Sequence, residues 1–325
     1  MRSTTLGSKG PQVGVIGLGC MGMTHAYDPR GRDDTVSASV VRQAVDLGVT
    51  LIDTADVYGP FTNEELVGKA LAEAPGGSLR DSVVLATKGG LTLDGDLASS
   101  GELVRNGRPE HVRAAIDASL RRLRTDRVDL YQLHRVDPDV PVEETWGALA
   151  EAVAAGKALQ IGLSEASVDE IRRAQAVHPV ASVQSELSLW TRDALAEVLP
   201  YCESEGIAFL PFSPLGRGFL TGSIASADDL PADDWRSRLP RFQAEALAAN
   251  QSLVGTVRAI AERHGATPAQ VALAWVLAQG QYVVPIPGTK TPKYLVDNAG
   301  AADLVLTAGD LAQLDALPAP TGTRY

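Results

Sequence analysis

The chain has 325 residues, of which 45% are hydrophobic, 21% charged and 5% aromatic. At roughly 150 residues per domain this length allows two domains, although barrels of this size are often single units. The net charge of −11 argues against a surface for nucleic acid or for an anionic membrane, because both need a basic field.

Cysteine usage and the opening residues indicate the compartment. Two cysteines, Cys20 and Cys202, are too few for a disulfide scaffold and are typical of a reducing environment. The opening sequence MRSTTLGSKG is polar and does not resemble a signal peptide. No apolar run reaches the roughly 18 residues that a membrane span needs. We therefore expect a cytoplasmic protein with neither a membrane nor a nucleic-acid partner.

Strands and helices are expected to alternate along the chain. A short hairpin over residues 4–13 precedes the first main strand. Eight strands follow, with a helical pattern between each successive pair: Val13–Leu18, Thr50–Asp53, Val83–Thr87, Val128–His134, Ala158–Leu163, Ala181–Gln184, Ile207–Phe212 and Tyr282–Ile286. Such alternation indicates a parallel sheet, and eight units favour a closed (β/α)₈ barrel that takes up residues 1–325 as one domain. An open doubly wound sheet is the rival architecture.

Helix boundaries are marked by glycines and by capping residues. Glycine recurs where an amphipathic stretch gives way to an apolar run, at Gly48, Gly156, Gly206 and Gly280, and is expected there as a left-handed C-cap. Three helix starts have capping-box spacing, namely Thr62–Glu65, Ser167–Glu170 and Thr267–Gln270. Pro141, followed by two glutamates, predicts a fourth start.

Two connections, residues 89–109 and 215–241, are too long to be plain turns. Loops of this length in a compact domain usually form lids or binding loops. In a barrel such loops matter most at the mouth formed by the carboxyl ends of the strands, and we expect both of them there.

Gly17, Gly19 and Gly22 match the G-x-G-x-x-G pattern of dinucleotide-binding loops and follow a predicted strand. That fingerprint requires a helix immediately afterwards, with its N-terminus facing the pyrophosphate. The next residues include Pro29 and Gly31 and have no helical period. We therefore interpret the motif as a tight loop that ends the strand, so a nicotinamide cofactor would need its phosphates held elsewhere.

Polar side chains gather where the second, third and fourth predicted strands end. Asp53, Lys88 and His134 occupy equivalent positions there, and Tyr58 lies on the loop after the second strand. A buried Asp and a buried Lys are tolerated as a pair. An ammonium near a phenol lowers the pKa of the tyrosine from about 10. The four residues therefore predict a general acid, Tyr58, whose proton a neighbouring imidazole can share.

Eight motifs follow one another along almost the whole chain: GLGCMGM, IDTADVYG, ATK, DLYQLHRVDP, GLSEAS, QSELSLW, FSPLGRGFLTG and VPIPGTK. In this order they resemble the motifs of the aldo-keto reductase superfamily, most of all its bacterial and plant branch. The resemblance implies a (β/α)₈ barrel and NADPH-dependent interconversion of carbonyls and alcohols. It also implies a catalytic tetrad, which falls on Asp53, Tyr58, Lys88 and His134.

The resemblance further implies roles for individual residues. Tyr58 would protonate the carbonyl oxygen, Lys88 with Asp53 would depress the pKa of Tyr58, and His134 would orient the carbonyl. The cofactor contacts would be Ser164, Glu165, Gln184 and Phe212 for the nicotinamide, Ser213, Leu215, Gly216, Arg217, Gly288, Thr289 and Lys290 for the phosphates, and Asp297 and Asn298 for the adenine. Tyr294 stands where some relatives have an arginine on the 2′-phosphate, so NADH stays open beside NADPH.

A small-molecule carbonyl or alcohol is the expected substrate, and four candidate walls of its pocket are Met23, Tyr27, Trp190 and Trp235. No metal site is expected, since His25, His111, His178 and His264 have no metal-ligand spacing. Two other functions stay open: a regulatory subunit resembling channel β-subunits, with little turnover, and an aldolase-type barrel in which Lys88 forms a Schiff base. The particular substrate, the favoured direction and the oligomeric state are not predicted.

Overall fold

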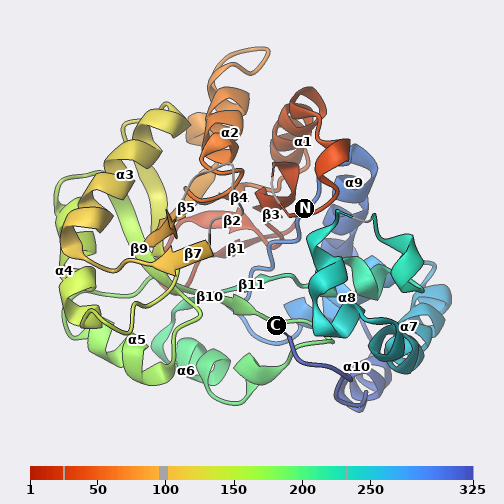
Figure 1. Ribbon diagram of the computed structural model, residues 1–325. Helices are drawn as coiled ribbons and strands as arrows, with labels where there is room; N and C mark the ends of the chain where they lie inside the picture. The colour runs from red at the N-terminus through yellow and green to blue at the C-terminus, as the bar shows by residue number, and fades with distance from the viewer. Residues whose placement is uncertain (25, 95–101, 232, 325) are drawn as a thin grey trace.

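The computed structural model describes residues 1–24, 26–94, 102–231 and 233–324 (Figure 1). A seven-stranded parallel sheet has the order β11-β10-β9-β8-β5-β4-β3. Its strands are β3 (Leu18–Gly19), β4 (Leu51–Asp53), β5 (Val84–Gly89), β8 (Val128–Leu133), β9 (Ala158–Ser164), β10 (Ser182–Glu186) and β11 (Ala208–Phe212). Sequence neighbours thus lie side by side in space, as the predicted alternation requires.

Residues 283–288 close the sheet into a barrel between β11 and β3. The amides of Val284 and Ile286 donate to Phe209 and Pro211 on one side, at 2.9 and 3.0 Å. The carbonyls of Pro285 and Pro287 accept from residues 17 and 19 on the other side. Proline has no N–H, so this eighth strand makes an interrupted ladder. The predicted (β/α)₈ barrel is confirmed, and the open sheet is not.

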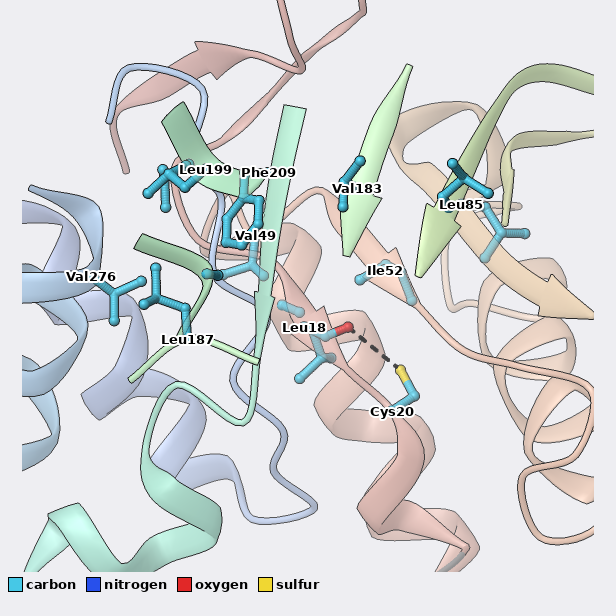
Figure 2. Close-up of a cluster of buried hydrophobic side chains, with 14 of the residues drawn as sticks. Leu18, Cys20, Val49, Ile52, Leu85, Val183, Leu187, Leu199, Phe209 and Val276 are labelled. Atoms are coloured by element: carbon cyan, nitrogen blue, oxygen red, sulfur yellow. Dashed lines mark hydrogen bonds between the residues drawn. The ribbon is translucent and has the colours of Figure 1, made fainter. Parts of the chain in front are cut away.

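Helices surround the barrel (Figure 1). They are α1 (Asp34–Asp46), α2 (Thr62–Ala72), α3 (Pro109–Leu123), α4 (Val142–Ala154), α5 (Val168–Gln175), α6 (Val198–Glu205), α7 (Ala244–His264), α8 (Pro268–Leu277), α9 (Pro292–Gly300) and α10 (Ala308–Asp315). Because strand side chains alternate between two faces, Leu18, Ile52, Leu85, Val183 and Phe209 pack outward in the cluster shared with the helices (Figure 2).

The opposite face of the same strands fills the barrel. Leu51, Val84, Leu130 and Leu210 form an inner cluster with residues of the N-terminal hairpin, β1 (Ser3–Thr5) and β2 (Gln12–Gly14). The hairpin is the one predicted. The expected strand Val13–Leu18 is wrong at its start, because Val13 pairs with Thr4 in the hairpin and the parallel sheet begins at Leu18.

Most predicted helix boundaries are confirmed. Ser167 and Thr267 make complete capping boxes with Glu170 and Gln270, and α4 begins directly after Pro141. The box expected at Thr62 is wrong, since its hydroxyl donates to the carbonyl of Gly59 and Phe61 is the N-cap residue. Gly48, Gly156 and Gly206 have positive φ, as expected of C-caps, whereas Gly280 does not.

The glycine motif ends in a 3₁₀ turn over Met21–Met23, and α1 starts only at Asp34. The carbonyl of Ile286 would lie 2.8 Å from a Cβ at Gly19, so that glycine allows strand closure. The interpretation of the motif as a tight loop that ends the strand therefore agrees with the structure.

The first long connection contains a hairpin, β6 (Leu91–Asp94) with β7 (Glu102–Arg105), and the second contains 3₁₀ turns.

Candidate active site

Because side chains alternate along a strand, four polar side chains point into the barrel near the carboxyl ends of its strands. Asp53, Lys88, Gln132 and Gln184 lie on the same faces of β4, β5, β8 and β10 as the inner apolar cluster. All four are buried, with at most 3% of each residue exposed. Water therefore screens the charges of Asp53 and Lys88 weakly, and each must be compensated by the protein.

Lys88 is the centre of the arrangement. Its Nζ donates to Asp53 Oδ1 at 2.5 Å, to the carbonyl of Thr54 at 2.8 Å and to Tyr58 Oη at 3.4 Å. Burial lowers the pKa of Lys88, but the charge of Asp53, the interaction with Tyr58 and the hydrogen bonds to both together outweigh burial and leave the pKa above its ordinary value. The lysine is therefore an ammonium at neutral pH, which is unsuited to forming a Schiff base.

Tyr58 contacts both this ammonium and the imidazole of His134. Burial raises the pKa of the phenol, and the opposing field of Lys88 offsets only part of that rise. The expected net lowering of the Tyr58 pKa is thus wrong, because the buried position of the phenol was not foreseen. The consequence suits an acid, since the phenol stays protonated at neutral pH while Lys88 favours the phenolate that remains after transfer.

The imidazole of His134 meets the Tyr58 ring edge-to-face, with centroids 5.7 Å apart. Burial, together with the charges of Lys88 and Arg135, holds the pKa of His134 well below its ordinary value. A neutral imidazole has one N–H to donate and one nitrogen to accept. His134 can therefore donate a hydrogen bond to a carbonyl oxygen without adding a positive charge.

Gln132 is a site residue that the sequence interpretation missed. Its Nε2 lies 3.3 Å from Asp53 Oδ2, and the Nε2 of Gln184 lies 2.9 Å from the same oxygen. The sequence did contain a signal: Gln132 is a polar residue two positions after Leu130, so it faces the barrel interior like Leu130. In the structure it lies opposite Lys88 in the register of β5 and β8. Gln184, expected against the nicotinamide, thus has a second contact on Asp53.

The residues expected around the nicotinamide do lie together. Ser164 and Gln184 are paired in register on β9 and β10, and Glu165 follows with a positive φ of 54°. Glu165 is ion-paired with Arg324 at 2.5 Å, and the same guanidinium lies 5.4 Å over the ring of Phe212. Arg324, far away in sequence, was not predicted near this group.

The expected phosphate loop after β11 turns sharply, with left-handed backbone at Ser213, Gly216 and Arg217. A Cβ at Gly216 would come 2.8 Å from the ring of Trp190, so only glycine fits there without a shift. Leu215 lies in the same turn, and its carbonyl accepts from the amides of residues 218 and 220. The guanidinium of Arg217 pairs with Glu186 at 3.1 Å.

The second expected phosphate segment begins at Gly288, which bridges to Gly19. Thr289 accepts a hydrogen bond from the amide of Thr291. Lys290 Nζ donates to the carbonyl of Asp28 at 2.8 Å and lies 3.2 Å from its carboxylate. Two adenine candidates have other surroundings: Asp297 accepts from the hydroxyl of Thr267 at 2.9 Å, and Asn298 is buried in α9.

The four substrate candidates divide into two pairs. Met23 and Trp190 are core residues, 1% and 2% exposed, and Trp190 stacks on Phe219 with centroids 4.2 Å apart. Tyr27 and Trp235 are half-buried, and the guanidinium groups of Arg236 and Arg217 lie over their rings at 4.9 and 5.2 Å. Met23 and Trp190 also follow the carboxyl ends of strands, β3 and β10, but of the four only Tyr27 and Trp235 are partly exposed.

Within the described ranges, no three His, Cys, Asp or Glu side chains are arranged to hold a metal ion. His25 lies outside those ranges. No helix among the described residues is long and apolar enough to cross a membrane.

A closed (β/α)₈ barrel with a lysine–aspartate pair, a tyrosine and a histidine at its mouth defines the class of protein. The model of the Aldo/keto reductase family matches residues 15–319, and the chain belongs to this family. It is thus an oxidoreductase of a family that uses a nicotinamide cofactor.

Three relatives show how similar the chain is to known members. A probable aldo-keto reductase 1 from Glycine max is 47% identical over 96% of this chain and 88% of its own length. The structure of a glycerol dehydrogenase from Gluconobacter oxydans has a TM-score of 0.85, with 30% identity over 96% of this chain and 94% of that one. An aldo/keto reductase from Klebsiella pneumoniae, in complex with NADP and acetate, has a TM-score of 0.73 and 28% identity over 99% and 97%.

Proposed function

We propose that the chain is an NADPH-dependent reductase of aldehydes or ketones, which also runs in reverse on alcohols. The observation that carries the proposal is the position of Lys88 between Asp53 and Tyr58, in a buried site with a neutral imidazole beside the phenol. This arrangement supplies a proton donor and a hydrogen-bond donor for the same carbonyl oxygen.

The residues present fit a nicotinamide dinucleotide. The left-handed turn at Ser213, Gly216 and Arg217 allows close approach of backbone to an anion, and the Gln184 amide has an acceptor oxygen for a carboxamide. When bound, the cofactor supplies a hydride to the carbonyl carbon. Tyr58 would give its proton to the oxygen, Lys88 would stabilise the phenolate left behind, and His134 would orient the oxygen beforehand.

Replacing Tyr58 with Phe tests the assignment of the acid. The expected result is a loss of kcat by a factor of about 10² to 10⁴, the range typical of a general acid. The dissociation constant for NADPH, measured by fluorescence quenching, should stay within about twofold because the ring is retained. A variant that reduces aldehydes at the wild-type rate would exclude Tyr58 as the proton donor.

Lys290 is the proposed contact for the 2′-phosphate, although its ammonium lies on Asp28 in this structure. Replacing Lys290 with Ala should raise the KM for NADPH about tenfold and leave the KM for NADH unchanged, since only NADPH has that phosphate. Lys69→Ala is a charge-matched control, because Lys69 is an exposed lysine in the last turn of α2. Equal KM changes for both cofactors in Lys290→Ala would count against this role.

The other functions are less well supported. The relatives described above carry the names of reductases and a dehydrogenase, which does not favour a regulatory subunit. The ammonium state of Lys88 argues against an aldolase. Steady-state oxidation of NADPH with a panel of simple aldehydes separates these possibilities: turnover supports the reductase, and its absence with tight NADPH binding supports a regulatory subunit.

A further inference from the structure

The two oxygens of Asp53 have different partners. Oδ1 accepts from the ammonium of Lys88 at 2.5 Å. Oδ2 accepts from two neutral amides, Gln184 at 2.9 Å and Gln132 at 3.3 Å. The carboxylate therefore shares its negative charge between one cation and two amide donors, all of them buried.

The sheet is built to place Gln132 at this carboxylate. Gln132 lies opposite Lys88 on β5 and opposite Gly162 on β9. A Cβ at Gly162 would lie 3.2 Å from Cγ of Gln132 and 2.2 Å from the hydroxyl oxygen of Ser182. The glycine therefore leaves room above all for Ser182, and a larger residue there would also crowd the side chain of Gln132.

The charges of Lys88 and Asp53 act on Tyr58 with opposite signs. The ammonium lowers the pKa of the phenol, and the carboxylate raises it. Amide donors on Asp53 Oδ2 stabilise part of the carboxylate charge, so that more of the lysine field remains at the phenol. We propose that Gln132 is a positioning residue of the active site, which holds Asp53 so that Lys88 can act on Tyr58. The proposal rests on the proposed reductase function.

A pair of isosteric variants tests this role. Gln132→Met and Gln184→Met each remove one amide donor from Asp53 and preserve side-chain length. Gln132→Met should lower kcat about tenfold, the effect of one hydrogen bond to a charged group, with the KM for NADPH unchanged. Gln184→Met should lower kcat and also raise that KM, because Gln184 is the one expected on the nicotinamide.

The ionisation of Tyr58 gives a readout that a merely structural role would not move. The tyrosinate absorbance of each protein is titrated against its own Tyr58→Phe derivative, without cofactor. Loss of the Gln132 donor should move the midpoint of Tyr58 upward. The proposal is overturned if Gln132→Met only lowers the melting temperature and leaves the titration midpoint of Tyr58 unchanged. It is also overturned if Gln132→Met raises the KM for NADPH. A wild-type protein that reduces no carbonyl would instead contradict the proposed function, and the titration would still decide the effect of Gln132 on Tyr58.

The segment after α10 returns to the barrel mouth (Figure 1). Asn250 on α7 exchanges two hydrogen bonds with the backbone of Thr321, at 3.1 and 2.9 Å. Arg241 donates to the carbonyl of Gly322, whose φ of 91° suits glycine. These contacts direct the chain so that Arg324, two residues after Gly322, lies at the ends of β9, β10 and β11.

Arg324 there lies among groups expected to contact the cofactor. Its guanidinium pairs with Glu165 at 2.5 Å and with Glu186 at 2.8 Å, and lies 5.4 Å over the ring of Phe212. Glu165 and Phe212 are the residues that we expect against the amide and the ring of the nicotinamide. The Arg324 guanidinium and a nicotinamide would therefore occupy the same space beside Glu165 and Phe212, so only one of them can be there at a time.

We infer that Arg324 occupies the nicotinamide end of the cofactor site and that cofactor binding displaces it. This inference also rests on the proposed function. A protein whose binding-competent state is a minor one shows a weaker apparent affinity, in proportion to the population of that state. With Arg324 in place, the apparent affinity for cofactor is therefore lower than that of the open site.

Replacement of Arg324 with Ala tests the displacement. NADP⁺ should bind about tenfold more tightly and associate faster, as expected if the open state is about a tenth of the population. Arg113→Ala is the control, since Arg113 pairs with Glu151 on the surface of α3 and α4. Unchanged or weaker binding by Arg324→Ala overturns the inference. If neither the wild type nor the variant binds NADP⁺, the proposed function fails together with it.

Discussion

Asp56 lies in the loop between β4 and α2, two residues before Tyr58. Its buried carboxyl group has no role in the proposed reaction. The residue is 3% exposed, and its carboxyl group accepts a hydrogen bond from the amide of Val57 at 2.7 Å. Burial, followed by repulsion from Glu64, raises its pKa from 3.8 to about 8, although Arg122 and Lys88 act in the opposite direction. At neutral pH the folded protein therefore holds a proton at Asp56 that the unfolded chain has lost.

This difference predicts how stability depends on pH. Because the folded pKa is raised, the contribution of Asp56 to the free energy of unfolding falls as pH rises from about 4 through about 8. Asp56→Asn keeps the shape and removes the titration. The difference between its melting temperature and that of the wild type, measured by calorimetry, should increase with pH across this range. At pH 8.5 the variant should melt at least about 2 °C higher than the wild type. A difference that does not change with pH would contradict a buried, protonated Asp56.

The positions of the catalytic side chains could be predicted from the sequence, but the direction of the Tyr58 pKa shift could not. The strand-end positions of Asp53, Lys88 and His134 follow from period two and from the shared mouth of a barrel, and the structure brings them together with Tyr58. The sign of the Tyr58 pKa shift was wrong, because the extent of burial depends on segments far away in sequence. Arg324 was missed for the same reason, since no local pattern reports where a chain returns after α10.

Elements were predicted best where a local signal decides them. The boxes at Ser167 and Thr267 are satisfied by residues three positions away, which a sequence shows directly. The eighth strand was predicted from its apolar run, yet its ladder is interrupted because two of its residues are prolines. At Thr62 the helix entry is set instead by Phe61, whose positive φ of 64° no sequence rule required.

The junction between α7 and α10 combines a cap with ion pairs. Asp310 accepts from the hydroxyl of Thr307 at 2.6 Å, and pairs with His264 at 2.8 Å and with Arg263 at 2.6 Å. These contacts, the hydroxyl of Thr307 first among them, hold the pKa of Asp310 well below its ordinary value. Its stabilisation is therefore present above the ordinary aspartate range and is lost as pH falls below it.

Asp310→Ala should lower the free energy of unfolding at pH 7 by about 2 kcal/mol, which is the upper end for a lost cap. Glu170→Ala, in the capping box of α5, is a matched comparison, because the Glu170 carboxylate caps its helix through Ser167. We expect that variant to lose about 1 kcal/mol. Equal losses in urea denaturation would mean that the ion pairs to α7 contribute nothing.

At the scale of the whole molecule, an acidic protein is proposed to bind an anionic dinucleotide. The net charge is −11, but Arg217 and Arg241 lie at the barrel mouth beside Glu186. Arg217 is already ion-paired there, so a phosphate must compete with a carboxylate as well as with water. That the 325 residues form one domain remains a prediction.

Ligand binding should then appear as added stability of the entire fold. A ligand at 100 times its dissociation constant stabilises the folded state by about 2.7 kcal/mol, which for a domain of this size raises the melting temperature by several degrees. We expect a larger shift with NADPH than with NADH at the same concentration, since only the first can pair its 2′-phosphate with Lys290. The shift should shrink as salt is raised, because the phosphate contacts are electrostatic. Differential scanning fluorimetry with both cofactors at two salt concentrations measures these effects, and equal shifts for NADPH and NADH would show that the protein does not recognise the 2′-phosphate.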